Sequence, residues 1–183
     1  MQGVTGIQDV CGILLENESD ILVHDCEIQY TGFFSSRTDA FVYGINGLNL
    51  YGDNNIYSNK IHDITYKGAG TYKGVCALQV IAALSSVTIV CNHFIAGILN
   101  ERENSSNLVL ATGITATGKN GAVNIYHNSF YFSYAQNENL APSALIFIPA
   151  GTAINLKVNN NILKINLTLH MKRHILFIWA VIV

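Results

Sequence analysis

A six-residue pattern that recurs about every 33 residues constrains this chain more than any other feature. Each copy has an apolar residue, two variable residues, a small polar residue that is usually Asn, one variable residue and a second apolar residue. The clear copies are IYSNKI from Ile56, IVCNHF from Ile89, IYHNSF from Ile125 and VNNNIL from Val158, and VHDCEI from Val23 is a weaker copy. The small polar positions follow one another at steps of 33, 33, 36 and 33 residues. Such self-similarity predicts repeats that stack on one another.

Each repeat is expected to contain three short strands. Apolar and polar residues alternate on both sides of the small polar residue, which indicates two strands that meet at a bend there. A third strand is expected 14 to 18 residues upstream, where each copy has a small residue followed by an apolar one. These pairs are Gly12-Ile13, Gly44-Ile45, Gly74-Val75, Gly113-Ile114 and Ala144-Leu145.

Stacked repeats bury an apolar face that no single repeat could bury. We expect two inward columns of apolar side chains and one column of small polar side chains, in which amides bond to one another. The first inward column is Val23, Ile56, Ile89, Ile125 and Val158. The second is Ile28, Ile61, Phe94, Phe130 and Leu163. The polar ladder is Cys26, Asn59, Asn92, Asn128 and Asn161.

These motifs, between about residues 10 and 166, resemble the right-handed parallel β-helix of pectate lyases, polygalacturonases, phage tailspikes and many surface proteins. The resemblance implies an all-β fold, a right-handed parallel β-helix (solenoid) of about five rungs with long inserts between rungs. A leucine-rich repeat is the rival fold, but only Leu48 to Ile56 has its spacing. We therefore expect a β-helix domain over residues 1–166 and an apolar C-terminal tail over residues 167–183.

The inserts and the tail differ in character from the repeats. Inserts at 31–43, 65–73, 99–112 and 133–143 carry many of the charges and are expected as loops along one side of the solenoid. The tail ends in a nine-residue apolar run, 175–183, whereas a membrane helix needs about 20 residues. A strand or helix that covers the C-terminal mouth is expected there, and no complete membrane span. The first repeat starts almost at once and no signal peptide precedes it, which favours a fragment of a longer protein.

Composition excludes some classes of function. Only 12% of the residues are charged, against about 25% on average, and the formal net charge is −2. No basic stripe is present, so a nucleic-acid partner is not expected. The four cysteines lack the spacing of a metal site and do not fall at equivalent positions of neighbouring repeats, so free thiols are expected.

The resemblance implies either a calcium-dependent lyase or a glycoside hydrolase, and both need clustered carboxylates. Lyases of this fold hold calcium with several carboxylates, and glycoside hydrolases need two carboxylates at a defined separation. The outward positions of the first strands are expected at Leu14, Glu16, Asn46, Cys76, Thr115 and Phe147, of which only one is acidic. We therefore expect no catalytic residues, no metal site and no cofactor in this segment, although the question of an enzyme stays open.

A mixed polar and aromatic surface is expected around the bend. Tyr57, Lys60, His93 and Tyr126 are the candidate ligand-binding residues, because aromatic faces can stack on sugar rings. An ordinary exposed sheet face is the alternative interpretation of the same residues. The hypothesis for function is a non-catalytic β-helix scaffold of a secreted or cell-surface protein, adhesin-like or binding a polysaccharide or surface glycan. The alternative is a fragment of a polysaccharide lyase or glycoside hydrolase of the pectate-lyase-like fold.

Overall fold

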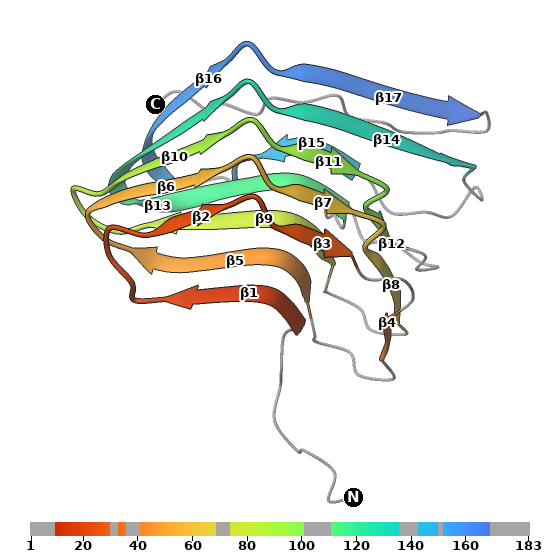
Figure 1. The fold of residues 1–183 in the computed structure, drawn as a ribbon, viewed down its shortest axis with the longest axis horizontal. Helices are drawn as coiled ribbons and strands as arrows, with labels where there is room; N and C mark the ends of the chain where they lie inside the picture. The colour runs from red at the N-terminus through yellow and green to blue at the C-terminus, as the bar shows by residue number, and fades with distance from the viewer. Residues whose placement is uncertain are drawn as a thin grey trace, which may run out of the picture.

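The computed structural model describes residues 10–29, 33–35, 41–68, 74–100, 111–135, 143–149 and 152–168. Every regular element in these ranges is a strand, and every strand pairing is parallel. The chain coils upward through successive turns, so that strands from successive repeats lie side by side (Figure 1). The predicted all-β parallel solenoid is confirmed, and its right hand stays a prediction.

Corresponding strands of the turns form four stacks. The first stack is β1 (Val10–Glu16), β5 (Val42–Leu50), β9 (Val75–Ala82), β13 (Ala111–Tyr126) and β15 (Ser143–Phe147). The second is β2 (Leu22–His24), β6 (Asp53–Tyr57), β10 (Val87–Cys91), β13 again and β16 (Ala153–Asn159). The third is β3 (Glu27–Gln29), β7 (Lys60–His62), β11 (Phe94–Ala96), β14 (Ser129–Ala135) and β17 (Ile162–Thr168). The fourth is β4 (Phe33–Ser35), β8 (Thr65–Gly68) and β12 (Leu99–Asn100).

The fourth stack corrects two expectations. Its strands lie inside three of the segments that were expected to be loops. Because only three turns place a described strand in all four stacks, about three turns are complete, whereas about five rungs were predicted. The remaining parts of the inserts, and residues 169–183 of the tail, lie outside the described residues, as does the expected cover over the C-terminal mouth. Strand β17 continues to Thr168, two residues past the predicted domain boundary.

The stacked turns enclose one apolar core, in which β-branched and aromatic side chains lie above their equivalents. The first inward column is Val23, Ile56, Val90, Ile125 and Val158. The second is Ile28, Ile61, Ile95, Phe130 and Leu163. Both columns match the prediction except in the third repeat, where Val90 and Ile95 replace Ile89 and Phe94.

The third repeat was aligned one residue out of register. Its Asn92 was matched to Asn59, but the strand pairing matches Val90 with Ile56 and Ile95 with Ile61. A shift by one residue reverses which side chains of a strand face inward. Phe94 is accordingly 44% exposed, whereas Ile95 is fully buried. The first stack contains a similar error. Strand pairing places Leu78 and Ile146 at the positions that were expected for Val75 and Leu145. The row in register is Ile13, Ile45, Leu78, Ile114 and Ile146.

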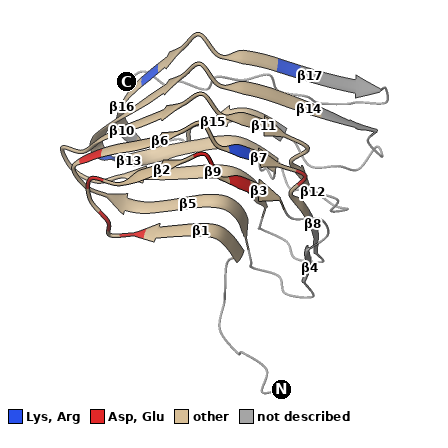
Figure 2. Ribbon diagram, in the orientation of Figure 1, with Lys and Arg blue, Asp and Glu red and all other residues tan. Residues whose placement is uncertain are grey.

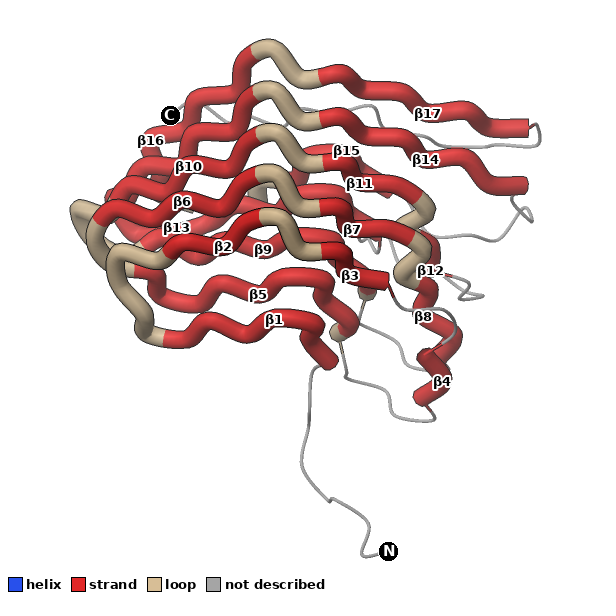
Figure 3. The backbone as a smooth tube through the Cα atoms, in the orientation of Figure 1, coloured by secondary structure: helices blue, strands red, loops and turns tan. Residues whose placement is uncertain are grey.

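The bend between the second and third stacks has the same geometry in all five repeats, and these bends lie above one another (Figure 3). The residue before the ladder position has a left-handed backbone in each, which Asn, Asp and His tolerate better than most residues. The five residues and their φ angles are Asp25 at 53°, Ser58 at 54°, Asn92 at 57°, His127 at 57° and Asn160 at 53°. Asn92 therefore makes the turn, and the ladder position of its repeat is His93.

From Asn59 onward, each ladder side chain bonds the backbone of the turn before it, whereas Cys26 bonds the carbonyl of His24 in its own turn. Asn128 accepts from the N–H of His93 at 3.0 Å and donates to the carbonyl of Val90 at 3.0 Å. Asn59 and Asn161 each make the equivalent pair of bonds to the turn before their own. Direct bonding between the ladder amides was expected, but within the described ladder it is present only from Asn128 to Asn161, at 3.0 Å. The ladder satisfies buried backbone groups at the bend, which would otherwise be costly.

Candidate functional site

The structure brings Tyr57 and Tyr126 to the outward face around the bend, as predicted, but Cys91 and not Val90 lies between them. Lys60 lies on the same face, where its Nζ contacts Glu27 Oε1 at 2.6 Å. Glu27 also contacts His62 Nε2 at 2.9 Å. These hydrogen bonds and the charge of Lys60 hold the pKa of the Glu27 carboxyl below its usual value.

The expectation that His93 belongs to this outward face is wrong. Its side chain occupies the ladder and only 2% of the residue is exposed. Nδ1 accepts from the N–H of Asn59 at 3.2 Å, and Nε2 donates to the carbonyl of Ile56 at 3.0 Å. The imidazole thus reproduces the two bonds of a ladder Asn, which requires its neutral form with the proton on Nε2. Burial lowers the pKa of His93 to about 4.

Two rings on this face, those of His24 and Tyr57, stack on one another along the solenoid. The ring centroids of His24 and Tyr57 lie 4.9 Å apart and the two planes differ by 2°. One face of each ring is therefore covered by the other, and the opposite face of Tyr57 looks along the stack toward Cys91. A sugar ring packs against an open aromatic face. The geometry of this surface thus gives little support to the predicted stacking of sugars on Tyr57.

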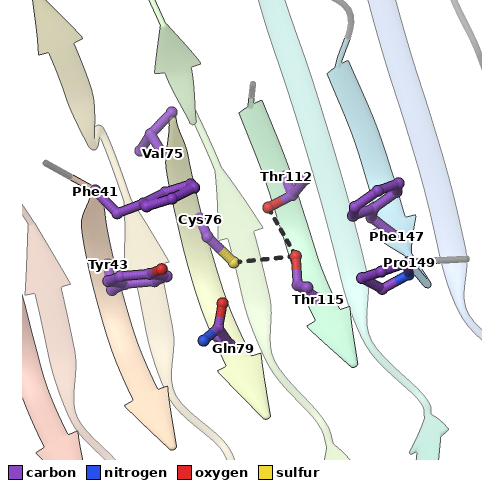
Figure 4. A pocket seen from close by; sticks show the side chains of 9 residues that line it. All are labelled: Phe41, Tyr43, Val75, Cys76, Gln79, Thr112, Thr115, Phe147 and Pro149. Carbon is purple, nitrogen blue, oxygen red and sulfur yellow. Dashed lines mark hydrogen bonds between the residues drawn. The ribbon is translucent and has the colours of Figure 1, made fainter. Parts of the chain in front are cut away.

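A pocket of about 190 Å³ lies on the outer side of the first stack (Figure 4). Its floor is formed by side chains of the two central strands, β9 and β13. Phe41 and Tyr43, at the start of β5, stand at one end, and Phe147 and Pro149, at the end of β15, stand at the other. The described residues that line it are Phe41, Tyr43, Val75, Cys76, Gln79, Thr112, Thr115, Phe147 and Pro149.

Local curvature of β13 gathers polar groups on the floor. Thr112 and Thr115 are three residues apart, yet the Thr115 hydroxyl donates to the Thr112 hydroxyl at 3.1 Å (Figure 4). At Gly113 an added Cβ would collide with the carbonyl oxygen of Leu145 and lie 2.8 Å from the Phe130 ring, so the backbone of β13 runs close to β15 and to the core there. Thr112 and Thr115 both line the pocket, as do Cys76 and Gln79, which are also three residues apart, on β9.

A directed chain of hydrogen bonds crosses the floor. Cys76 Sγ donates to Thr115 Oγ1 at 3.5 Å, and Thr115 donates in turn to Thr112. A hydroxyl that accepts keeps its own proton to donate. Gln79 donates its amide to Asn46 Oδ1 at 3.2 Å, which leaves its oxygen as an acceptor. Burial raises the pKa of the Cys76 thiol, so the thiol stays protonated and serves as a donor.

The walls of the pocket are formed by rings, which are apolar apart from the Tyr43 hydroxyl. Phe41 and Tyr43 stack with ring centroids 5.4 Å apart, and Phe147 and Pro149 stand opposite them (Figure 4). Strands β5, β9 and β15 contain no charged residue, and Lys119 is the one in β13. The charged residues of the described ranges lie mainly at bends and on the other stacks (Figure 2).

The described lining can bind but offers no acid–base pair. It contains no carboxylate, imidazole, ammonium or guanidinium group. General acid–base catalysis requires a group that exchanges protons near neutral pH, and glycoside hydrolysis requires two carboxylates. Within the described ranges, no three His, Cys, Asp or Glu side chains gather closely enough to hold a metal ion. The same ranges contain four free cysteines, as expected, although only Cys76 is fully buried.

Sequence analysis found part of this pocket. Cys76, Thr115 and Phe147 were expected to point outward from the first stack, and all three line it. Phe41, Tyr43, Gln79 and Thr112 were missed. The pairing of Gln79 with Asn46 and Thr115 shows that Gln79, and not Cys76, occupies that row. The two aromatic residues Phe41 and Tyr43, at the start of β5, were the available signal.

Comparisons of the chain with protein-family models, with curated proteins and with solved structures gave no match. Among the described residues, no helix of the length and apolar character needed for a membrane crossing is found.

Proposed function

We propose that this chain is a non-catalytic β-solenoid scaffold of a secreted or cell-surface protein and that it binds a glycan through the pocket on the first stack. The observation that carries the proposal is the combination of aromatic walls with a polar, uncharged floor in one pocket. Apolar ring faces and hydrogen-bonding hydroxyl and amide groups are complementary to a sugar ring. The fragment of a lyase or hydrolase is less favoured, because the described lining lacks a carboxylate.

We also propose that the solenoid is right-handed and related to the pectate-lyase-like superfamily. Short bends with Asn at the ladder position support this relationship. Crossover connections between parallel strands are right-handed in about 98% of known cases, which supports the hand.

The expected affinity is low. A hexose has about 12 non-hydrogen atoms, and at about −0.3 kcal/mol per atom it gains about −4 kcal/mol, a Kd near 1 mM. A glycan array probed with a multivalent display of the chain is therefore the appropriate measurement. We expect the parent to bind, the Phe147→Ala variant to lose binding, and the Tyr57→Ala, Tyr126→Ala double variant to keep it.

Two controls make the comparison specific. Phe94→Ala removes an exposed aromatic ring from the third stack and should leave binding unchanged. Circular dichroism melts of all variants show whether any loss of binding is a loss of fold. Binding that is lost in the double Tyr variant and kept in Phe147→Ala would move the site to the bend. An array on which the folded parent binds nothing would refute the glycan proposal.

A further inference from the structure

The pocket is small and closed at two ends. At about 190 Å³ it is below the roughly 300–1,000 Å³ typical of pockets for drug-sized ligands. Strands β5 and β15 are separated by β9 and β13, so their backbones lie about 14 Å apart at the usual strand spacing. The side chains of Phe41 and Tyr43 at one end and Phe147 and Pro149 at the other occupy part of that width (Figure 4). The remaining space between the walls corresponds to one six-membered ring.

The walls also decide how a glycan could lie. Equivalent side chains of a solenoid repeat along its axis, so an extended glycan would be expected to run in that direction, from β5 toward β15. Here both of those directions are blocked by ring side chains. A polymer that followed the solenoid axis would have to leave the floor at each wall. The contacts of the pocket are therefore confined to one sugar residue.

The floor of the pocket offers one hydrogen-bond donor and one acceptor to a bound sugar ring. Thr112 is 5% exposed, and its hydroxyl, which accepts from Thr115, keeps a proton to donate. Gln79 keeps an amide oxygen that can accept. Sugar hydroxyls are both donors and acceptors, so they can satisfy both groups, whereas an apolar ligand would leave them unpaired.

The charge of the lining argues for a neutral ligand. The described lining residues have no cationic side chain. A carboxylate or phosphate that entered this partly desolvated pocket would lose hydration without gaining a paired charge, which is costly. Uronic acids are thus disfavoured relative to neutral sugars.

We propose that the pocket recognises a single neutral pyranose ring, held by Thr112 and Gln79 between two aromatic walls, and gains nothing from a longer saccharide. This inference rests on the proposed function, since it specifies the ligand class of the same pocket. The chain would then recognise a terminal or single sugar unit, and would not bind a polysaccharide along a groove.

The test compares three kinds of probe by NMR chemical-shift titration of the full chain. The probes are methyl glycosides of glucose, galactose and mannose, the methyl glycosides of glucuronic and galacturonic acid, and the trisaccharides built from each of the five sugars. We expect at least one neutral glycoside to bind, its trisaccharide to bind within about threefold of it, and the uronic acids to bind at least about 10-fold more weakly. Thr112→Val should weaken binding about 10-fold, because one hydrogen bond is lost. Thr112→Ser keeps the hydroxyl and should stay within about threefold of the parent.

The outcomes separate the two proposals. A trisaccharide that binds 10-fold more tightly than its monosaccharide overturns the single-ring inference and leaves glycan binding in place. Tighter binding of a uronic acid overturns the neutral specificity alone. An unchanged affinity in folded Thr112→Val removes the assigned role of Thr112. If no saccharide of any kind binds the folded parent, the proposed function fails together with this inference.

Discussion

Two regions of each repeat differ in how strongly their side chains are constrained. One is the bend between the second and third stacks, and the other is the outer face of the first stack. At the bend, the ladder side chains from Asn59 onward bond the backbone of the turn before them, so these four positions carry amide or imidazole groups that point inward. On the outer face, one strand has Tyr43, the next Cys76 and the next Thr112 in the same row. Positions that satisfy buried backbone groups repeat, whereas positions that face outward vary and are free to form a site.

The largest expected effect is at the centre of the ladder. Asn128 is fully buried, and Asn128→Leu leaves the His93 N–H and the Val90 carbonyl without their side-chain partner. At about 1–3 kcal/mol for each buried unsatisfied group, we expect the free energy of unfolding to fall by about 4 kcal/mol. Chemical denaturation measures this difference. Asn155→Leu, at an exposed position of β16, is the matched control and should change stability by about 0.5 kcal/mol or less. Equal effects of the two substitutions would contradict the ladder.

The second expected effect is a pH dependence of stability that arises at the bend, from His93. The pKa of buried His93 is about 4, against an ordinary value of 6.5. Between these values the unfolded chain binds more protons than the folded one, so the stability from His93 is complete above about pH 6.5 and is lost as the pH falls through 4. The difference corresponds to about 3 kcal/mol.

Substitution of His93 isolates its contribution. His93→Asn restores the side chain found at neighbouring ladder positions and keeps both bonds without a titrating group. Denaturation between pH 4 and pH 7 should then show a flatter pH dependence than in the parent. His127→Asn, at an exposed bend residue, should retain the pH dependence of the parent. A His93→Asn variant with the full pH dependence would mean that another group causes it.

The smallest effect is expected on the outer face. Gln79 is half-buried and its side chain makes one hydrogen bond, to Asn46. Gln79→Leu should lower the free energy of unfolding by about 1 kcal/mol or less, because only one partly exposed bond is lost. Thermal melts measure the change. A loss as large as that of Asn128→Leu would remove the distinction between a structural bend and a variable outer face.

Several features of the fold follow from the sequence alone. The spacing of Asn59, Asn128 and Asn161 predicted the repeat and the bend, because every turn must satisfy the same backbone groups with the same side chain, and the resemblance of the motif to a known fold implied the parallel strands. The columns through Ile56 and Ile61 followed from the period-two alternation on either side. In the third repeat this reasoning failed, because an imidazole can make the same two bonds as an amide. His93 was therefore taken as an exposed residue, and Asn92, which resembles the ladder residue in type, was placed inside.

The pocket was decided by the tertiary structure. Phe41 and Phe147 are 106 residues apart in the sequence and stand at opposite ends of one pocket only because two intervening strands set their separation. The hydroxyls of Thr112 and Thr115 meet on the floor, where the backbone of β13 approaches β15 closely at Gly113. No local pattern encodes these distances. The sequence determined the column that each turn must repeat, because that bonding is local to one bend, whereas the site depends on which variable side chains the stacking happens to place in neighbouring rows.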